Sequence, residues 1–430
     1  MSGATAKASG VPSGAGDLYE SGGGGVSLKR RLRRAERLSK FKYLALIAPL
    51  AAFLLVTFVW PIGSLLYRSV DNPEVVQALP RTTHALRTWD GTGVPDEAVF
   101  DALATDLASD RRSPVLAGAA KRLNMEMAGF RSLLINTARK LEWQPGQPAK
   151  AAILAAEPRW EDTGVWRIVA RNSSSITAFY LLSALDLRIG DDGGIVSAPD
   201  DQAIYVDILI RTFWMSVIVT AWCLLLGYPL AYLLSQVSTG TSNLLMILVL
   251  LPFWTSVLVR VAAWIVLLQN EGPINKALMA LGLISDPLQL VFNRIGVYIA
   301  MVHILLPFVV LPLYAVMKSV PPAYMRAAVS LGCPPFKSFW KVYFPQTLPG
   351  VGAGGLLVFI LAMGYYITPA LLGSPKEQMT SYFVAFYTNE TINWGMAAAL
   401  SAVLLVATLI LYVFYARYFG PARARQIAPR

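Results

Sequence analysis

The stretch between Arg211 and Arg260 contains no Asp, Glu, Lys or Arg, and this run constrains the possible folds more than any other feature. A helix needs about 20 consecutive apolar residues to cross a bilayer, so the run can hold two spans. The whole chain is 55% hydrophobic and 15% charged, whereas soluble domains carry about 25% charged residues. The sequence therefore predicts an integral membrane protein.

Six apolar runs have the length of a membrane-spanning helix, which predicts an all-α integral membrane protein with six transmembrane helices. The first run is too long for the core of a signal peptide, which is about 7–15 residues, so we expect an uncleaved span. The predicted spans are Tyr43–Tyr67, Thr212–Leu234, Leu244–Leu268, Ile295–Met317, Gly350–Leu372 and Gly395–Ala416.

Residues 70–205 interrupt this pattern with polar, mixed-charge sequence between the first and second spans. Within Leu116–Leu141 the apolar residues recur at roughly helical spacing, among them Leu116, Leu123 and Phe130. About 130 residues can bury a core of their own. We expect a largely helical insert domain on the periplasmic side of the membrane.

The charges predict an orientation. Residues 70–205 hold 14 basic and 18 acidic residues, which leaves 23 of the 37 basic and 8 of the 26 acidic residues for the rest. Basic residues concentrate before the first span, in the loop 318–349 and after the sixth span, and cytoplasmic loops carry this excess. We therefore expect the multi-pass chain in a bacterial inner membrane, facing anionic lipid, with both termini in the cytoplasm.

These observations divide the chain into five parts. Residues 1–42 are rich in Gly, Ser and Ala and then basic, which predicts a disordered cytoplasmic N-terminus. The first span (43–67) and the insert (70–205) follow. Residues 206–418 form a five-helix membrane core with the loop 318–349, and residues 419–430 form a cytoplasmic tail.

Several site types are excluded by the same sequence. The basic excess flanks apolar runs, which argues against a nucleic-acid partner. The two cysteines and two histidines form no cluster that suggests a metal, a cofactor or a catalytic centre, so we expect no enzyme. The segment Gly332–Ser338 lacks the glycine before Lys337 that a phosphate-binding loop requires. Gly350 and Gly354 open an apolar span, where this spacing favours close helix packing.

The loop 318–349 contains the most informative motif. Arg326, Ala327 and Ala328 are followed by Gly332, and Val342 and Pro345 come later in the loop. This arrangement resembles the EAA loop of type I ABC-importer permeases, with Arg326 in place of the family's Glu. The resemblance implies that these six residues belong to a short helix and turn that dock on a separate ATPase and transmit its closure.

Further segments of the core resemble the spermidine/putrescine-type permeases. The resemblance implies a dimer of ATP-binding subunits, a second permease subunit, a periplasmic substrate-binding protein and a polyamine-like substrate. It does not extend to the insert. The matching segments are Leu225–Leu233, Leu251–Ser256, Arg260–Trp264, Gly272–Asn275, Leu305–Pro312, Thr368–Gly373 and Trp394–Leu400.

Five residues are candidates for the translocation pathway. An ionisable residue inside a span, such as Arg260, usually faces the bundle interior or a water-filled path. Aromatic faces can attract a cation, which makes Trp254, Trp264, Tyr365 and Tyr366 candidates as well. For each aromatic, packing or an interfacial position remains the alternative, and for Arg260 the alternative is satisfaction by carbonyls at a helix break.

Two other function classes fit the sequence less well. An ion-coupled secondary transporter of a small organic solute typically shows inverted repeats and acids embedded in the membrane, and the sequence has neither. A membrane enzyme would need a convergent set of catalytic side chains. The sequence therefore favours a permease whose transport is driven by ATP hydrolysis in a partner subunit.

Overall fold

A computed structural model describes residues 42–43, 45–109, 113–190 and 193–419. The chain divides into two compact units, Met1–Ser64 and Leu65–Arg430. Six helices are long and apolar enough to cross a membrane, which confirms the all-α membrane fold. Of the predicted segment 1–42 only Lys42 is described, and the predicted tail is described only at Phe419.

The first candidate span is Ala45–Tyr67, with a mean hydropathy of 2.3. It includes a π-helical turn, η1 (Leu55–Val59), and ends with α2 (Trp60–Tyr67). The Thr57 hydroxyl donates to the carbonyl of Phe53 at 2.7 Å, which satisfies the polar group within the helix itself.

The insert is built from short helices and one small hairpin. The two strands, β1 and β2, are antiparallel, with Arg188 opposite Val196. The elements are α3 (Pro73–Ala78), α4 (Pro80–Ala85), η2 (Leu86–Thr88), α5 (Glu97–Ser109), α6 (Pro114–Leu123), α7 (Phe130–Lys140), α8 (Ala149–Ala156), η3 (Pro158–Glu161), α9 (Thr163–Arg171), α10 (Phe179–Ser183), β1 (Leu187–Ile189) and β2 (Ile195–Ser197).

The helical periodicity of Leu116–Leu141 is realised as two helices, α6 and α7. The chain turns between them at Gly129, whose φ of +87° belongs to the left-handed region that glycine adopts easily. Both helices bury their apolar faces in one core around Trp160 and Trp166. The Trp160 indole N–H donates to the Thr137 hydroxyl at 2.8 Å, and that of Trp166 to the Trp160 carbonyl at 2.8 Å. The insert thus has a core of its own, in which the indole N–H groups of Trp160 and Trp166 are hydrogen-bonded.

The entry and exit segments of the insert run side by side. The Asn72 N–H donates to the Ser175 carbonyl at 2.9 Å, and the Thr177 N–H donates to the Val70 carbonyl at 2.8 Å. Asp71 and Ile176 form an antiparallel bridge between these bonds. Residues 73–174 therefore leave and return at one place.

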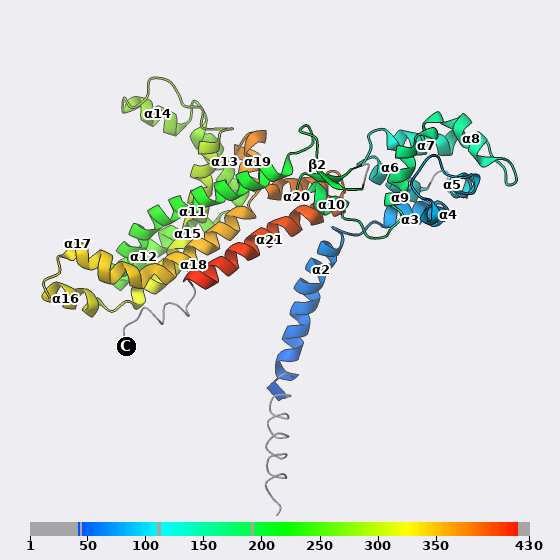
Figure 1. Cartoon of the computed structure of the whole chain (residues 1–430). Coiled ribbons are helices and arrows are strands. Elements are labelled where there is room, and N and C mark those ends of the chain that lie inside the picture. Colours follow the sequence, from blue (N-terminus) through cyan, green and yellow to red (C-terminus); the bar gives the residue numbers. More distant parts are fainter. Residues whose placement is uncertain (1–41, 44, 110–112, 191–192, 420–430) are drawn as a thin grey trace, which may run out of the picture. The chain divides into compact units, whose positions relative to one another are not determined.

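The membrane core contains the remaining helices. Its long helices α11, α15 and α18 lie against one another (Figure 1). The elements are α11 (Tyr205–Gln236), α12 (Thr239–Leu250), η4 (Leu251–Trp254), α13 (Val257–Leu268), α14 (Pro273–Ala280), α15 (Arg294–Ser319), α16 (Pro322–Ser330), α17 (Pro335–Ser338), η5 (Phe339–Tyr343), α18 (Phe344–Met363), α19 (Ile367–Leu372), η6 (Pro375–Glu377), α20 (Thr380–Asn389) and α21 (Trp394–Phe419).

Small residues bring α15 and α18 close together, as the Gly350–Gly354 spacing predicts. A Cβ at Gly354 would lie 3.1 Å from the carbonyl oxygen of Val309, and one at Gly350 would lie 3.0 Å from the Cβ of Val316. Backbone atoms cannot yield as a flexible side chain can. Any larger residue at Gly354 would therefore push the two helices apart.

Two predicted spans have different boundaries. The predicted span Leu244–Leu268 is broken, because α12 and η4 end at Trp254 and a new helix starts at Val257. Ser256 caps that helix by accepting a hydrogen bond from the Val259 N–H. The helical segment of the fifth span is Pro335–Met363 and not Gly350–Leu372, so part of the predicted loop 318–349 is helical.

Candidate coupling and translocation sites

The segment after α15 folds as a short exposed helix with a defined end. Proline at the first positions of α16 suits a helix start because its missing N–H has no intrahelical partner there. At the other end Gly332 adopts φ +86°. The Cys333 N–H donates to the Ala328 carbonyl at 3.1 Å, and the Gly332 N–H donates to that of Val329 at 2.9 Å. These two bonds form a Schellman motif, which directs the chain out of the helix.

The six predicted coupling residues lie on two consecutive helical segments. Arg326 and Ala327 are exposed on α16 and Ala328 is half-buried. Gly332 follows in the turn. Val342 lies in η5 and Pro345 in the first turn of α18, and η5 packs against α16. The motif therefore joins an exposed helix to the start of the fifth span.

Apolar side chains are exposed around this turn. Leu331 is 89% exposed and Phe336 is 75% exposed. The rings of Phe336 and Trp340 lie 6.4 Å apart, edge to face. Contiguous exposed apolar surface marks interaction sites. We call the set Tyr324, Val329, Leu331, Phe336 and Trp340 the docking face.

Three of the five pathway candidates come together where α13, α15 and α19 meet. Arg260 and Trp264 lie one helical turn apart on α13, which packs against α19, and Tyr365 lies two residues before α19 begins. The Nε and Nη1 atoms of Arg260 are buried and have no hydrogen-bond partner among the described residues. The expected alternative, satisfaction of these atoms by carbonyl groups at the helix break, is therefore not seen.

His303 on α15 is a further member of this group that sequence reasoning missed. The Trp264 indole N–H donates to Nδ1 of His303 at 3.2 Å, so a neutral imidazole carries its proton on Nε2. Arg260 is within electrostatic reach of the same ring. The signal was present, because His303 is an ionisable residue inside an apolar span, as Arg260 is.

The other two candidates are not part of this group. Trp254 ends η4 and is 76% exposed, and Tyr366 is 41% exposed at the start of α19. Neither forms a ring contact with Arg260 or His303 in the described part of the chain. The arginine group is therefore Arg260, Trp264, His303 and Tyr365.

Comparison with known proteins agrees with this architecture. Residues 207–425 match the family described as the binding-protein-dependent transport system inner membrane component. The chain is 36% identical to the spermidine/putrescine transport system permease protein PotB of Haemophilus influenzae, over 49% of this chain and 74% of that protein. It is 31% identical to the inner membrane ABC transporter permease protein YdcU of Escherichia coli, over 50% of this chain and 72% of that protein.

Among solved structures, a bacterial alginate ABC transporter aligns with 50% of this chain and 80% of its own, at 16% identity and a TM-score of 0.43. The family match covers half of the chain and lies entirely outside the insert. It favours an ATP-driven importer over the secondary transporter considered above. The chain therefore belongs to the family of binding-protein-dependent transport system inner membrane components, as the multi-pass permease subunit of an ABC importer.

Proposed function

We propose that this permease imports a polyamine-like solute and that α16 with its Gly332 turn receives the force of a partner ATPase. One observation carries the coupling role: the turn presents an exposed apolar docking face while η5, which leads into α18, packs against α16. A displacement of α16 would therefore act on the start of the fifth span. The two orientations of the pore would differ in how well they accommodate the closed ATPases.

The docking face predicts which substitutions weaken assembly. Leu331→Glu should lower the yield of ATPase that co-purifies with the permease, because a buried unpaired carboxylate is costly at an interface. Arg326→Glu reverses the charge of an exposed residue beside that face, and we expect it to lower the yield as well.

The measurement is the ratio of ATPase to permease after affinity purification from membranes. Lys376→Glu is a matched control, since it reverses an exposed charge on η6. An unaltered ratio for Leu331→Glu would contradict docking at this face. An unaltered ratio for Arg326→Glu alone would mean that this side chain faces solvent in the complex.

The full transporter would comprise this chain, a second permease subunit, two ATP-binding subunits and a periplasmic binding protein. Relatives that match this chain over about half of its length are named as spermidine/putrescine permeases, whereas a relative named as a sulfate permease matches over only 29% of this chain. The longer matches support a polyamine-like substrate here. Aromatic side chains of the arginine group offer π faces to a cation. The binding protein would deliver the solute from outside.

The substrate proposal predicts ATP-dependent uptake. Proteoliposomes that contain the whole transporter and the binding protein should accumulate labelled spermidine or putrescine only when ATP is supplied to the ATPase side. Liposomes that contain this chain alone should not take up either solute. Uptake by the chain alone would overturn the ATP-driven mechanism, while ATP-dependent complexes that ignore both polyamines would overturn only the substrate.

The proposed orientation has both termini and the docking face in the cytoplasm, with the insert in the periplasm. It predicts that Gln144→Cys, an exposed insert position, reacts with a membrane-impermeant maleimide in cells whose outer membrane is permeabilised. Lys337→Cys should react only after the inner membrane is opened. The background is Cys333→Ser, and the reverse labelling pattern would invert the topology.

A further inference from the structure

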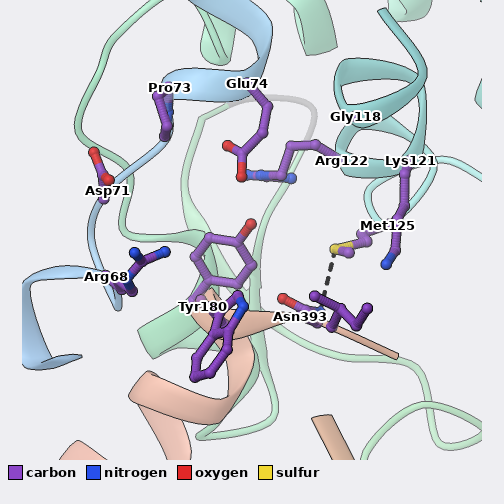
Figure 2. A pocket seen from close by; sticks show the side chains of 13 residues that line it. Arg68, Asp71, Pro73, Glu74, Gly118, Lys121, Arg122, Met125, Tyr180 and Asn393 are labelled. Carbon is purple, nitrogen blue, oxygen red and sulfur yellow. Dashed lines mark hydrogen bonds between the residues drawn. The ribbon is translucent and has the colours of Figure 1, made fainter. Parts of the chain in front are cut away.

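A cavity of about 290 Å³ lies between the insert and the start of the sixth span. Its walls come from α3 and α6 on one side and from the residues that lead into α21 on the other. Figure 2 shows these side chains from close by. We call it the junction pocket. It lies far along the chain from the docking face and from the arginine group, and the family match does not cover its insert wall.

The pocket concentrates charge of both signs. Arg68, Lys121 and Arg122 line it together with Asp71 and Glu74. The two carboxylates form no ion pair with another described residue, although basic side chains line the same cavity. Such a lining suits a ligand that itself carries separate positive and negative groups.

The Arg122 side chain is held in place within the pocket. It is 2% exposed, its Nε donates to Oδ1 of Asn72 at 3.1 Å, and its Nη2 donates to Oε1 of Glu126 at 3.0 Å. Its guanidinium carbon lies 4.1 Å from the centre of the Phe179 ring and 5.0 Å from that of Tyr180. These contacts hold the side chain in one position.

One donor of Arg122 is left over. Its Nη1 is buried and has no hydrogen-bond partner among the described residues, and the same is true of Oε2 of Glu74. In Figure 2 the Glu74 side chain and the Arg122 guanidinium point toward one another above the Tyr180 hydroxyl. The Glu126 carboxylate is shared with Arg171 at 3.7 Å, so it does not neutralise both guanidinium groups. A buried donor and a buried acceptor without partners are costly when the site is empty.

Met125 and Trp394 also line the pocket, and several contacts join its two walls. The Met125 sulfur accepts a hydrogen bond from Nδ2 of Asn393 at 3.6 Å, drawn in Figure 2. The guanidinium of Arg68 lies 5.7 Å from the centre of the Trp394 ring. The side-chain amine of Lys121 donates to the Thr391 carbonyl. These contacts leave Met125 and Trp394 as walls against which an aliphatic group can pack.

We propose that the junction pocket binds a small amino-carboxylate zwitterion. Its carboxylate accepts from Nη1 of Arg122, and its ammonium group donates to the carboxylates of Glu74 and Asp71. Charge-assisted hydrogen bonds of this kind are the strong ones. The volume is near the lower end of the range for small-molecule sites, about 300 Å³, and it far exceeds the roughly 30 Å³ of one water.

An occupant would touch the insert and the sixth span at once. Arg122 and Glu74 belong to the insert, whereas Asn393 and Trp394 begin α21. The ligand would therefore strengthen the attachment of the insert to a membrane helix. This gives the insert a role as a sensor of solutes other than the transported one.

The experiment measures binding to the complete transporter in lipid nanodiscs by titration calorimetry. The probes are L-leucine and 4-aminobutyrate, two zwitterions with different charge separations. The leucine analogues 3-methylbutylamine and 4-methylpentanoate each carry one of the two charges. At least one zwitterion should bind, and for leucine the affinity should exceed that of each analogue by about tenfold or more.

Two variants localise the binding. Glu74→Gln should weaken it about tenfold, and Gly118→Leu should abolish it by filling the pocket, because a Cβ at Gly118 already lies 4.0 Å from Cγ of Glu74. Glu161→Gln, at an exposed acid elsewhere in the insert, is the control and should bind as the parent does. Both pocket variants keep Arg122, whose loss could unfold the insert.

Three results would overturn the proposal. The first is the absence of any heat of binding with either zwitterion, which would mean that only water occupies the pocket. The second is equal binding of an analogue with a single charge, or tighter binding of spermidine. The third is unchanged binding in both pocket variants. None of these results depends on transport. Polyamine uptake by the same complexes tests the proposed function separately, so the failure of one proposal can be told from the failure of the other.

Discussion

Gly332→Val should uncouple ATP hydrolysis from uptake while the protein still inserts and assembles. A Cβ at Gly332 meets no atom within 4 Å, so the expected defect is conformational and not steric. A β-branched residue at φ +86° costs about 1–2 kcal/mol, which corresponds to a factor of about 5–30 in the population of the turn. The Schellman turn would open and α16 would present the docking face at another angle.

The measurement compares ATP hydrolysis with solute uptake in the same proteoliposomes. Uptake per ATP should fall about tenfold in Gly332→Val. Gly332→Asn is the matched variant, since asparagine is the residue that best replaces glycine in the left-handed region, and it should retain most of the coupling. Equal loss in both variants would point to a contact of the glycine itself, and unchanged coupling in Gly332→Val would remove the turn from the mechanism.

Arg260→Met should lower uptake about tenfold or more without lowering the thermal stability of the complex. Two buried guanidinium nitrogens lack hydrogen-bond partners among the described residues, and replacing a buried unpaired charge with an apolar side chain of similar length is often neutral or stabilising. A residue that is retained at a cost to stability indicates a functional role. We propose that Arg260 contacts water or solute in the pathway.

Uptake and the unfolding temperature should be measured on the same preparation. Arg294→Met is the control, because Arg294 is exposed and its Nε lies 3.7 Å from the Glu377 carboxylate, a pair that contributes little to stability. A large drop in the unfolding temperature of Arg260→Met would assign Arg260 a structural role. Normal uptake would exclude it from the pathway.

Much of the fold could be predicted because a membrane-spanning helix requires a long apolar segment without charges, and such segments are visible in the sequence. Charge-free runs of sufficient length mark spans, and the Ala327–Ala328–Gly332 spacing marks a short helix that ends in a turn at Gly332. The fifth span was placed too late because Pro345 and Pro349 suggest a break. The π-helical turn Phe339–Tyr343 lies directly before Pro345, and the helix runs through both prolines.

The sites were less accessible to sequence reasoning. Hydropathy cannot show that Trp264 donates to His303, because the partners come from different helices and meet only in the packed bundle. The break at Ser256 was hidden for a similar reason, since Ser and Thr are common inside apolar runs and only a cap contact reveals a helix start. The junction pocket likewise joins residues separated by more than two hundred positions.

The paired entry and exit segments of the insert affect how the chain folds and how the insert can vary. The hydrogen bond between Asn72 and Ser175 holds the two ends of residues 73–174 next to each other. To the rest of the protein, these residues are a loop whose ends are already joined. The entropy of closing a loop grows only with the logarithm of its length, about 0.6 kcal/mol for each doubling. A segment anchored in this way can gain residues at little entropic cost to the membrane helices, provided that the added residues lie away from Lys121 and Met125, which contact the residues before α21.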